Sequence, residues 1–205
     1  MALFEQTIQQ HPSFLESLHH QFLDEARKAA LAKFAETGFP TKKDEEYKYT
    51  NLREITEKDY NFYPKADHHI TKTQLDTLHL GEEHFDWIVF VNGQLHKELS
   101  KISIENVELL SFNYALNDEA HKEVFDNYFN KVANQDLALT NLNSAYCKYG
   151  FFLKVPKNVV IEKPIHIFYL SQNQDENTFY NTRNLLIVDE GAKVEVIESH
   201  HNFDD

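Results

Sequence analysis

Phe151-Phe152-Leu153-Lys154-Val155-Pro156 opens the stretch of sequence that decides the fold. Three further apolar runs follow it in the last third of the chain, at 164–170, 184–188 and 193–197. These runs have the length of strands and are rich in Ile, Val, Leu and Phe, and segment 189–192 supplies turn residues between the last two. No convincing helix pattern separates them. We therefore expect four strands in a row.

These strands fit two kinds of sheet. In an antiparallel meander, tight hairpins join neighbouring strands, and only segment 189–192 is short enough to form one. In a parallel β-solenoid, each coil returns the chain by one strand spacing, so equivalent strands recur at a period of about 20 or more residues. The step from Ile165 to Leu185 has this length. We expect the solenoid, and antiparallel pairing of 165–170 with 185–188 would exclude it.

The middle of the chain predicts a β-hairpin. Segment 85–91 is expected to form an apolar strand, Asn92-Gly93 is a tight-turn signal, and segment 94–99 is expected to form the second strand of the hairpin. Segment 107–112 adds a third strand. A small sheet is therefore expected near 85–112.

The segments outside these strands are predicted to be mainly helical. Ser13 and Glu16 form a capping box, and apolar residues then recur four apart, so we expect one amphipathic helix that ends near Gly38. Three other segments are expected to contain helix: 117–132, 136–146 and a short piece within the linker 56–84.

The composition excludes several classes of protein. The chain has 33 acidic and 20 basic residues and a net charge of −13, which repels a nucleic-acid backbone. No stretch approaches the roughly 20 apolar residues of a membrane span, and the N-terminus lacks the basic and apolar regions of a signal peptide. The single cysteine cannot form an internal disulfide, which agrees with a reducing compartment. We expect a cytoplasmic protein with no nucleic-acid or membrane partner.

The most distinctive string is Phe39-Pro40-Thr41-Lys42-Lys43-Asp44-Glu45-Glu46-Tyr47-Lys48-Tyr49-Thr50-Asn51-Leu52. Thr41 can cap a turn of helix whose first residues are acidic. Tyr47, Tyr49 and Leu52 supply amphipathic bulk that we expect to pack on the preceding helix. No nucleophile or metal-binding pattern is visible in the string.

This string resembles the Pro-Thr-basic-basic-x-Glu-Glu-Trp-Lys-Tyr-Thr-Asn-Leu signature of SufD-type proteins of the Suf iron–sulfur cluster assembly system, with Tyr47 at the usual Trp position. The Phe90-Val91-Asn92-Gly93 string resembles one in the same family. Further strings resemble the family's entry into its solenoid: Leu142-Asn143-Ser144-Ala145, Gly150, Val155-Pro156 and Pro164-Ile165. Tyr149 stands where an Asp usually precedes that glycine.

The resemblance implies an α+β fold. A helical N-terminal region with a small hairpin sheet near 85–112 is expected over residues 1–150, and the first coils of a right-handed parallel β-helix over 151–205. The chain is less than half the family's usual extent, so it resembles an N-terminal fragment. A solenoid that stops near residue 200 has an uncovered strand edge, and we expect this edge to pair with another chain, as a homodimer.

The resemblance also implies a function, that of a non-catalytic scaffold in a SufBCD-like complex. The partners of the full-length protein would be a SufB-type paralogue and a SufC-type ATPase. The family's functional residues lie later than this chain, so no catalytic, cofactor-binding or metal-binding residue is assigned. No resident cofactor is expected, and an iron–sulfur cluster would be held only transiently by the full complex. The alternatives are a SufB-type paralogue and a β-solenoid enzyme that acts on carbohydrate, such as a polysaccharide lyase or a left-handed-helix acyltransferase.

The residues that can carry chemistry are few. One cysteine cannot hold a complete cluster. Lys148 can lower the thiol pKa of the neighbouring Cys147, but we expect that cysteine to be a small, semi-buried structural residue. Adjacent histidines diverge, and His79 and His84 lack the His-Glu-x-x-His spacing of a metal site, so surface or partly buried histidines are expected. The paired acids Glu82-Glu83 are a weak signal for acid–base work.

Overall fold

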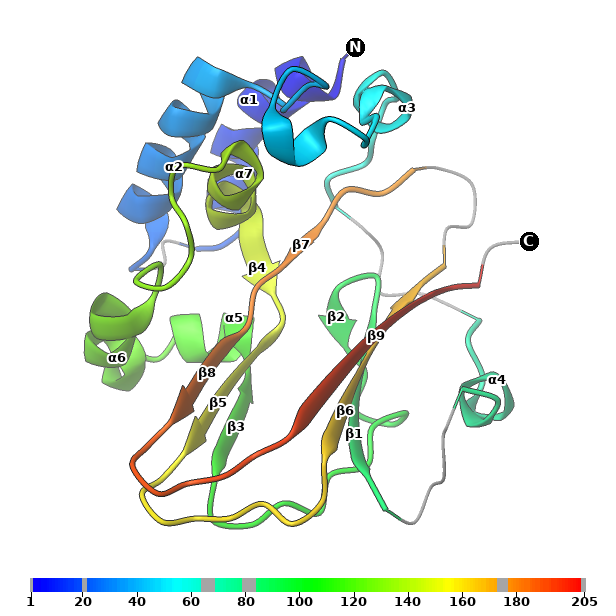
Figure 1. Cartoon of the computed structure of the whole chain (residues 1–205), viewed down its shortest axis with the longest axis vertical. Helices are drawn as coiled ribbons and strands as arrows, with labels where there is room; N and C mark the ends of the chain where they lie inside the picture. Colours follow the sequence, from blue (N-terminus) through cyan, green and yellow to red (C-terminus); the bar gives the residue numbers. More distant parts are fainter. Residues whose placement is uncertain (1, 20–21, 64–68, 79–83, 173–176, 204–205) are drawn as a thin grey trace. The chain divides into compact units, whose positions relative to one another are not determined.

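The computed structural model describes residues 2–19, 22–63, 69–78, 84–172 and 177–203 (Figure 1). The chain forms two compact units, each assembled from separate segments. The first comprises Met1–Tyr63, Tyr114–Lys148 and Glu176–Arg183, and the second comprises Pro64–Asn113, Tyr149–Asp175 and Asn184–Asp205. Helices and sheets are both present, so the predicted α+β class is confirmed.

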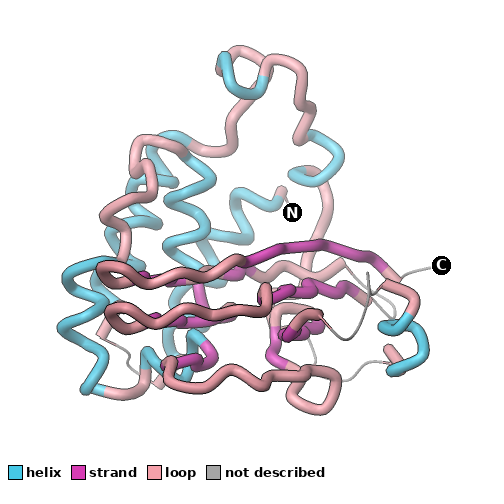
Figure 2. Tube along the Cα trace, turned by 60° about the horizontal axis from the view of Figure 1, so that its bottom comes forward, coloured by secondary structure: helices cyan, strands magenta, loops and turns pink. Residues whose placement is uncertain are grey.

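The first unit is mainly helical, and all helices are coloured cyan in Figure 2. Its elements are α1 (Leu3–Glu16), α2 (Asp24–Thr37), the 3₁₀ helix η1 (Glu45–Tyr47), α3 (Arg53–Thr56), the 3₁₀ helix η2 (Glu119–His121), α6 (Lys122–Tyr128), α7 (Ala138–Tyr146) and the short strand β7 (Asn181–Thr182). Helix α2 packs along α7, and α1 contacts both. Within the described ranges, none of the helices has the length and apolar composition needed to cross a bilayer.

The prediction of one helix from Ser13 to Gly38 is wrong at its start and in its middle. Ser13 lies inside α1, so it is not a cap, and the chain leaves helical geometry between Glu16 and Asp24. Leu18 is buried in the core cluster that α1 and α2 share, and Leu23, just before α2, is also buried. The predicted end is confirmed, because α2 stops at Thr37 and Gly38 takes a left-handed φ of 69°.

The Phe39–Leu52 string packs differently from the prediction. Tyr49 is 91% exposed, so the expectation that it packs on the preceding helix is wrong. The ring that does pack there is Phe39, whose centroid lies 5.1 Å from that of Phe34 in α2. The predicted cap is also wrong, because Asp44 and not Thr41 is the N-cap residue of η1, and its carboxylate accepts hydrogen bonds from the Thr41 backbone N–H and hydroxyl and does not cap the helix.

The second unit is built from two larger sheets, whose strands are drawn as arrows in Figure 1. The four-stranded sheet has the order β2-β1-β6-β9, and the three-stranded sheet has the order β3-β5-β8. The elements are α4 (Lys72–Asp76), β1 (Asp86–Val91), β2 (Gln94–Leu95), β3 (Glu108–Ser111), β5 (Phe151–Val155), β6 (Ile165–Ser171), β8 (Leu185–Val188) and β9 (Val196–Asn202). Two elements stand where the chain passes from one unit to the other: α5 (Phe112–Leu116) and β4 (Cys147–Tyr149), which pairs with β7.

The predicted hairpin is confirmed, and the strand predicted at 107–112 is present as β3 but lies in another sheet. Strands β1 and β2 pair antiparallel across Asn92 and Gly93, whose φ angles of 48° and 82° suit a tight hairpin turn. Strand β3 does not join this sheet but pairs antiparallel with β5. The second neighbour of β1 is instead β6, which runs parallel to it from Asp86↔Ile165 to Val91↔Leu170.

The four strands of the last third pair in parallel, so the meander alternative is wrong. Strand β5 pairs with β8, with Phe152 opposite Leu185, and β6 pairs with β9, with Ile165 opposite Val196. The predicted step from Ile165 to Leu185 is also wrong, because these two residues belong to different sheets. Strands that pair are separated by more residues than this step, as Phe152 and Leu185 or Ile165 and Val196 are, which lies within the expected period of about 20 or more residues.

The strands β1 and β6 are buried on both faces. Ile88 and Phe90 contribute to one apolar cluster together with residues of β5 and β6, whereas Trp87 and Val89 contribute to a second one that includes Leu75 of α4. Two buried faces explain the near-continuous apolar runs in these strands.

Candidate functional site

The second unit has an open strand edge, formed by β8 in one sheet and β9 in the other. Among the residues that the structure describes, each of these strands is the last in its sheet and has a paired strand on one side only. On β8, Leu186 is 41% exposed and Val188 is 42% exposed, while Ile187 between them is buried. An edge with unpaired backbone groups and exposed apolar side chains is a template for pairing with another chain. We define β8 and β9 together as the open edge.

The polar side chains of β9 are held by Tyr169 of its neighbour β6 and by Asn184, which directly precedes β8. The Asn184 amide nitrogen donates to the Tyr169 hydroxyl at 2.7 Å and to the Glu198 carboxylate at 2.8 Å. The His200 ring stacks on Tyr169 with a centroid distance of 4.8 Å. Burial raises the pKa of Tyr169 well above its usual value, so this hydroxyl stays neutral. These contacts within the chain hold the Glu198 and His200 side chains of β9 in place without a partner chain.

The histidines of β9 diverge, as adjacent residues on a strand must. His200 stacks on Tyr169, whereas His201 lies on the other face near Phe168. Across the described ranges, no group of three or more His, Cys, Asp or Glu side chains is placed to hold a metal ion. Several neighbouring histidines and acids of the sequence, for which no metal or acid–base site was expected, include residues outside those ranges: His19-His20, His68-His69, His79 with His84, Glu82-Glu83 and Asp204-Asp205.

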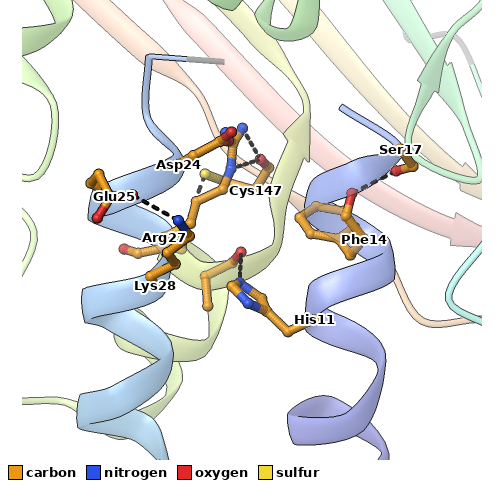
Figure 3. A network of polar contacts seen from close by, with 10 residues as sticks. His11, Phe14, Ser17, Asp24, Glu25, Arg27, Lys28 and Cys147 are labelled. Carbon is orange, nitrogen blue, oxygen red and sulfur yellow. Dashed lines mark hydrogen bonds and ion pairs between the residues drawn. The ribbon is translucent and has the colours of Figure 1, made fainter. Parts of the chain in front are cut away.

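Cys147 lies deep in the first unit, where α7 ends (Figure 3). Its side chain is fully buried, and the thiol donates to the Ser144 carbonyl at 3.3 Å. Burial raises the thiol pKa and outweighs the opposing effect of the Arg27 and Arg183 charges. The expectation that Cys147 is a structural residue agrees with this burial, and activation of its thiol by Lys148 does not.

We predict that Cys147 of the folded chain reacts with a maleimide at least about 1,000-fold more slowly than in urea. The reason is that a buried, protonated thiol can react only after the surrounding structure opens. The measurement is the labelling rate at neutral pH, followed by mass spectrometry. Similar rates in the folded and unfolded chain would contradict the buried assignment.

Arg27 is the residue of this region that the sequence interpretation missed. Its side chain is 0% exposed, and it donates to the Cys147 carbonyl from Nε at 3.3 Å and from Nη2 at 2.9 Å (Figure 3). It also contacts the Asp24 carboxylate at 3.1 Å. A signal was present, because Arg27 lies four residues from both Leu23 and Leu31, within an apolar stripe.

His11 makes a further polar contact, which joins α1 to α7. Its Nε2 lies 3.1 Å from the Ala145 carbonyl, and burial lowers its pKa. The neutral imidazole is therefore favoured, and Nε2–H donates to this carbonyl. Like Arg27, His11 satisfies a backbone group of the α7–β4 segment, so both side chains are structural.

Comparison with known proteins places the chain in a family. The model of the SufBD protein N-terminal region matches residues 2–167. The chain is 26% identical over 162 residues to an iron–sulfur cluster assembly SufBD family protein of Synechocystis sp., with 78% of this chain and 35% of that protein covered. A protein of the same description from Staphylococcus saprophyticus is 28% identical over 155 residues, with 73% and 32% covered.

The match extends over most of the chain but over a limited part of its relatives. Residues 2–167 include the helices of the first unit, the hairpin and the strands up to the start of β6. The chain spans about a third of the length of the curated relatives it matches. The chain belongs to the SufBD family of iron–sulfur cluster assembly proteins.

Proposed function

We propose that this chain is the N-terminal part of a SufD-type scaffold subunit, which supports iron–sulfur cluster assembly by binding other proteins and not by turnover of its own. The observation that carries the proposal is the open edge. Its two strands, β8 and β9, are the last described strands of their sheets, and the exposed Leu186 and Val188 flank the buried Ile187 on β8. The fragment holds no resident cofactor in this proposal. A nascent cluster is cargo, bound transiently by the full cytoplasmic complex.

The pairing in the second unit supports a parallel β-helix, which in this proposal is right-handed and begins near residue 151, after a helical region with a hairpin near 85–112 over 1–150. Residues of β5 pair with residues 33 positions later, as Phe152 does with Leu185, and residues of β6 pair 31 positions later, as Ile165 does with Val196. The connection between them also pairs, through a parallel bridge from Val160 to Lys193. Strand β5, Val160 and strand β6 thus each pair in parallel with a segment that follows about 30 residues later in the chain, which is the geometry of stacked coils.

The partners in this proposal are a SufB-type paralogue and a SufC-type ATPase, bound by the full-length protein. The experiment is co-purification of the tagged full-length protein with each candidate, with SufC-type ATPase turnover measured in the presence and absence of the complex. We expect a stable complex that contains both partners. A full-length protein that binds neither of them but cleaves or acylates a carbohydrate would overturn the scaffold proposal and favour a β-solenoid enzyme.

The open edge makes the isolated chain a candidate homodimer, and we predict that Val188→Lys weakens its self-association about tenfold or more. A lysine on an edge strand opposes strand pairing, because its charge must be desolvated in the interface. Light scattering over a concentration series measures the dissociation constant.

The matched control for this prediction is Val132→Lys. Val132 is 98% exposed in the first unit, so the control makes the same chemical change away from the open edge. We expect it to leave the dissociation constant unchanged. A monomer at every concentration, or equal effects of the two substitutions, would contradict dimerisation through this edge.

A further inference from the structure

The Phe39–Leu52 string surrounds a cavity within the first unit. The cavity has a volume of about 190 Å³ and is lined by residues 39–42 from one end of the string and by residues 50–53 and Thr56 from the other. The residues between them, 43–49, do not contribute to its wall. The two ends of the most distinctive string of the chain therefore lie close together and form the cavity wall.

The charge of this cavity is opposite to that of the chain. Lys42 and Arg53 line it and no aspartate or glutamate does, although the whole chain has a net charge of −13. Three threonines and Asn51 add neutral polar groups. A concave site with charge of one sign attracts counter-ions more strongly than a flat surface does. The wall composition is therefore suited to a negatively charged group.

Most of the donors in the wall are available. Glu57 accepts from Arg53 Nε at 2.5 Å, and within the described part of the chain the two terminal nitrogens of Arg53 have no partner. The same holds there for the Lys42 ammonium group and the Thr50 hydroxyl. Asn51 uses its side-chain oxygen to accept from the Arg53 backbone N–H, which leaves its amide nitrogen as a further donor.

The wall is also fixed without a ligand. The Asp44 carboxylate accepts from the Thr41 backbone N–H at 2.6 Å and from the Thr41 hydroxyl at 3.1 Å, and Thr41 in turn accepts from the Lys43 backbone N–H. These hydrogen bonds lower the pKa of Asp44, so this neighbouring acid is charged but engaged by Thr41. A site with little rearrangement to make loses less affinity on binding.

We propose that this cavity binds a single oxyanion group, a carboxylate or a phosphate. Lysine and arginine donate charge-assisted hydrogen bonds to such groups, and hydroxyl and amide donors complete their coordination. The volume lies below the roughly 300–1,000 Å³ of pockets for drug-sized ligands, so it suits one functional group and not a whole cofactor. The site is separate in sequence from the open edge and does not depend on the scaffold role.

The test is a titration of the whole chain with inorganic phosphate and, separately, with acetate, at constant ionic strength and followed by amide NMR shifts. We expect saturable shifts at 41–43 and 50–54. Saturation by both anions assigns general oxyanion chemistry to the site, and saturation by one of them assigns phosphate or carboxylate. The absence of saturable shifts in both titrations would overturn the proposal.

Variants distinguish the cavity from a diffuse attraction to basic residues. Lys42→Gln and Arg53→Gln should each weaken binding about fivefold, as expected for loss of one exposed charge contact. Lys43→Gln removes the same charge from the adjacent residue, which does not line the cavity, and should leave the affinity unchanged. Equal losses from Lys42→Gln and Lys43→Gln would overturn the site. All three side chains are exposed, so the variants are expected to fold.

Discussion

Replacement of Arg27 by alanine is expected to lower the free energy of unfolding by about 3 to 5 kcal/mol. The side chain is fully buried and donates twice to the Cys147 carbonyl, and it pairs with Asp24, whose side chain is only 15% exposed. Alanine removes these donors, leaves a buried carbonyl and a nearly buried carboxylate without them, and empties the space of the guanidinium. The loss is a large fraction of the roughly 5 to 15 kcal/mol typical of a folded domain.

Two further variants separate the causes of this loss. Arg27→Met keeps most of the buried volume but removes the donors, and we expect a smaller loss of about 1 to 3 kcal/mol. Lys28→Ala is the matched control, because the adjacent Lys28 pairs with Glu25 on the surface and its side chain is 56% exposed. Its effect should stay below about 1 kcal/mol. Urea denaturation followed by circular dichroism measures all three, and similar effects of Arg27→Ala and Lys28→Ala would contradict the buried role.

The helix ends show what local sequence can and cannot predict. Gly38 marks the end of α2 because a left-handed residue is a local requirement that glycine meets best. The break before α2 was missed because apolar residues continue at helical spacing through it. Its cause lies in tertiary structure, since Leu18 is buried in a cluster formed by residues of both helices.

The strands illustrate the same division between local and distant causes. Apolar runs and the Asn92-Gly93 turn predicted where the strands lie and how β1 and β2 pair. They did not predict that β1 also pairs with β6, because parallel partners can lie far apart in sequence and leave no local signal. The step from Ile165 to Leu185 did not identify the paired strands, because these two residues belong to different sheets.

The two proposed binding surfaces, the open edge and the cavity, also differ in how well they could be predicted. The open edge was predicted from the family resemblance, which implied a parallel β-helix with an uncovered last strand; among the described residues, β8 and β9 are the last strands of their sheets. The cavity around the Phe39–Leu52 string was not predicted, because it requires Lys42 and Arg53 to be brought together by a loop whose path depends on Phe39 packing against α2. The exposure of Tyr49 depends on the same path.

Tyr146 is the residue on which the core of the first unit converges. Its ring is buried and lies 4.8 Å from that of Phe14, 5.4 Å from that of Phe62 and 5.3 Å from that of Phe179, measured between centroids. These three partners come from distant parts of the chain. The Tyr146 hydroxyl donates to the Thr7 carbonyl of α1, and burial raises its pKa far above the usual value, so the donor keeps its proton. One side chain thus joins four segments.

We therefore expect Tyr146→Ala to lower the free energy of unfolding by about 3 to 5 kcal/mol, because a large ring is deleted from a packed core that cannot fully collapse. Tyr146→Phe retains the ring and loses only the hydroxyl, which leaves the Thr7 carbonyl without this donor, and should cost about 1 to 3 kcal/mol. Tyr128→Ala is the control, since Tyr128 is 50% exposed on α6, and its effect should stay within about 1 kcal/mol. In urea denaturation of the three variants, the loss should be largest for Tyr146→Ala, intermediate for Tyr146→Phe and smallest for Tyr128→Ala. If Tyr146→Phe proved as damaging as Tyr146→Ala, the hydrogen bond to α1, and not the aromatic cluster, would be the main contribution of this residue.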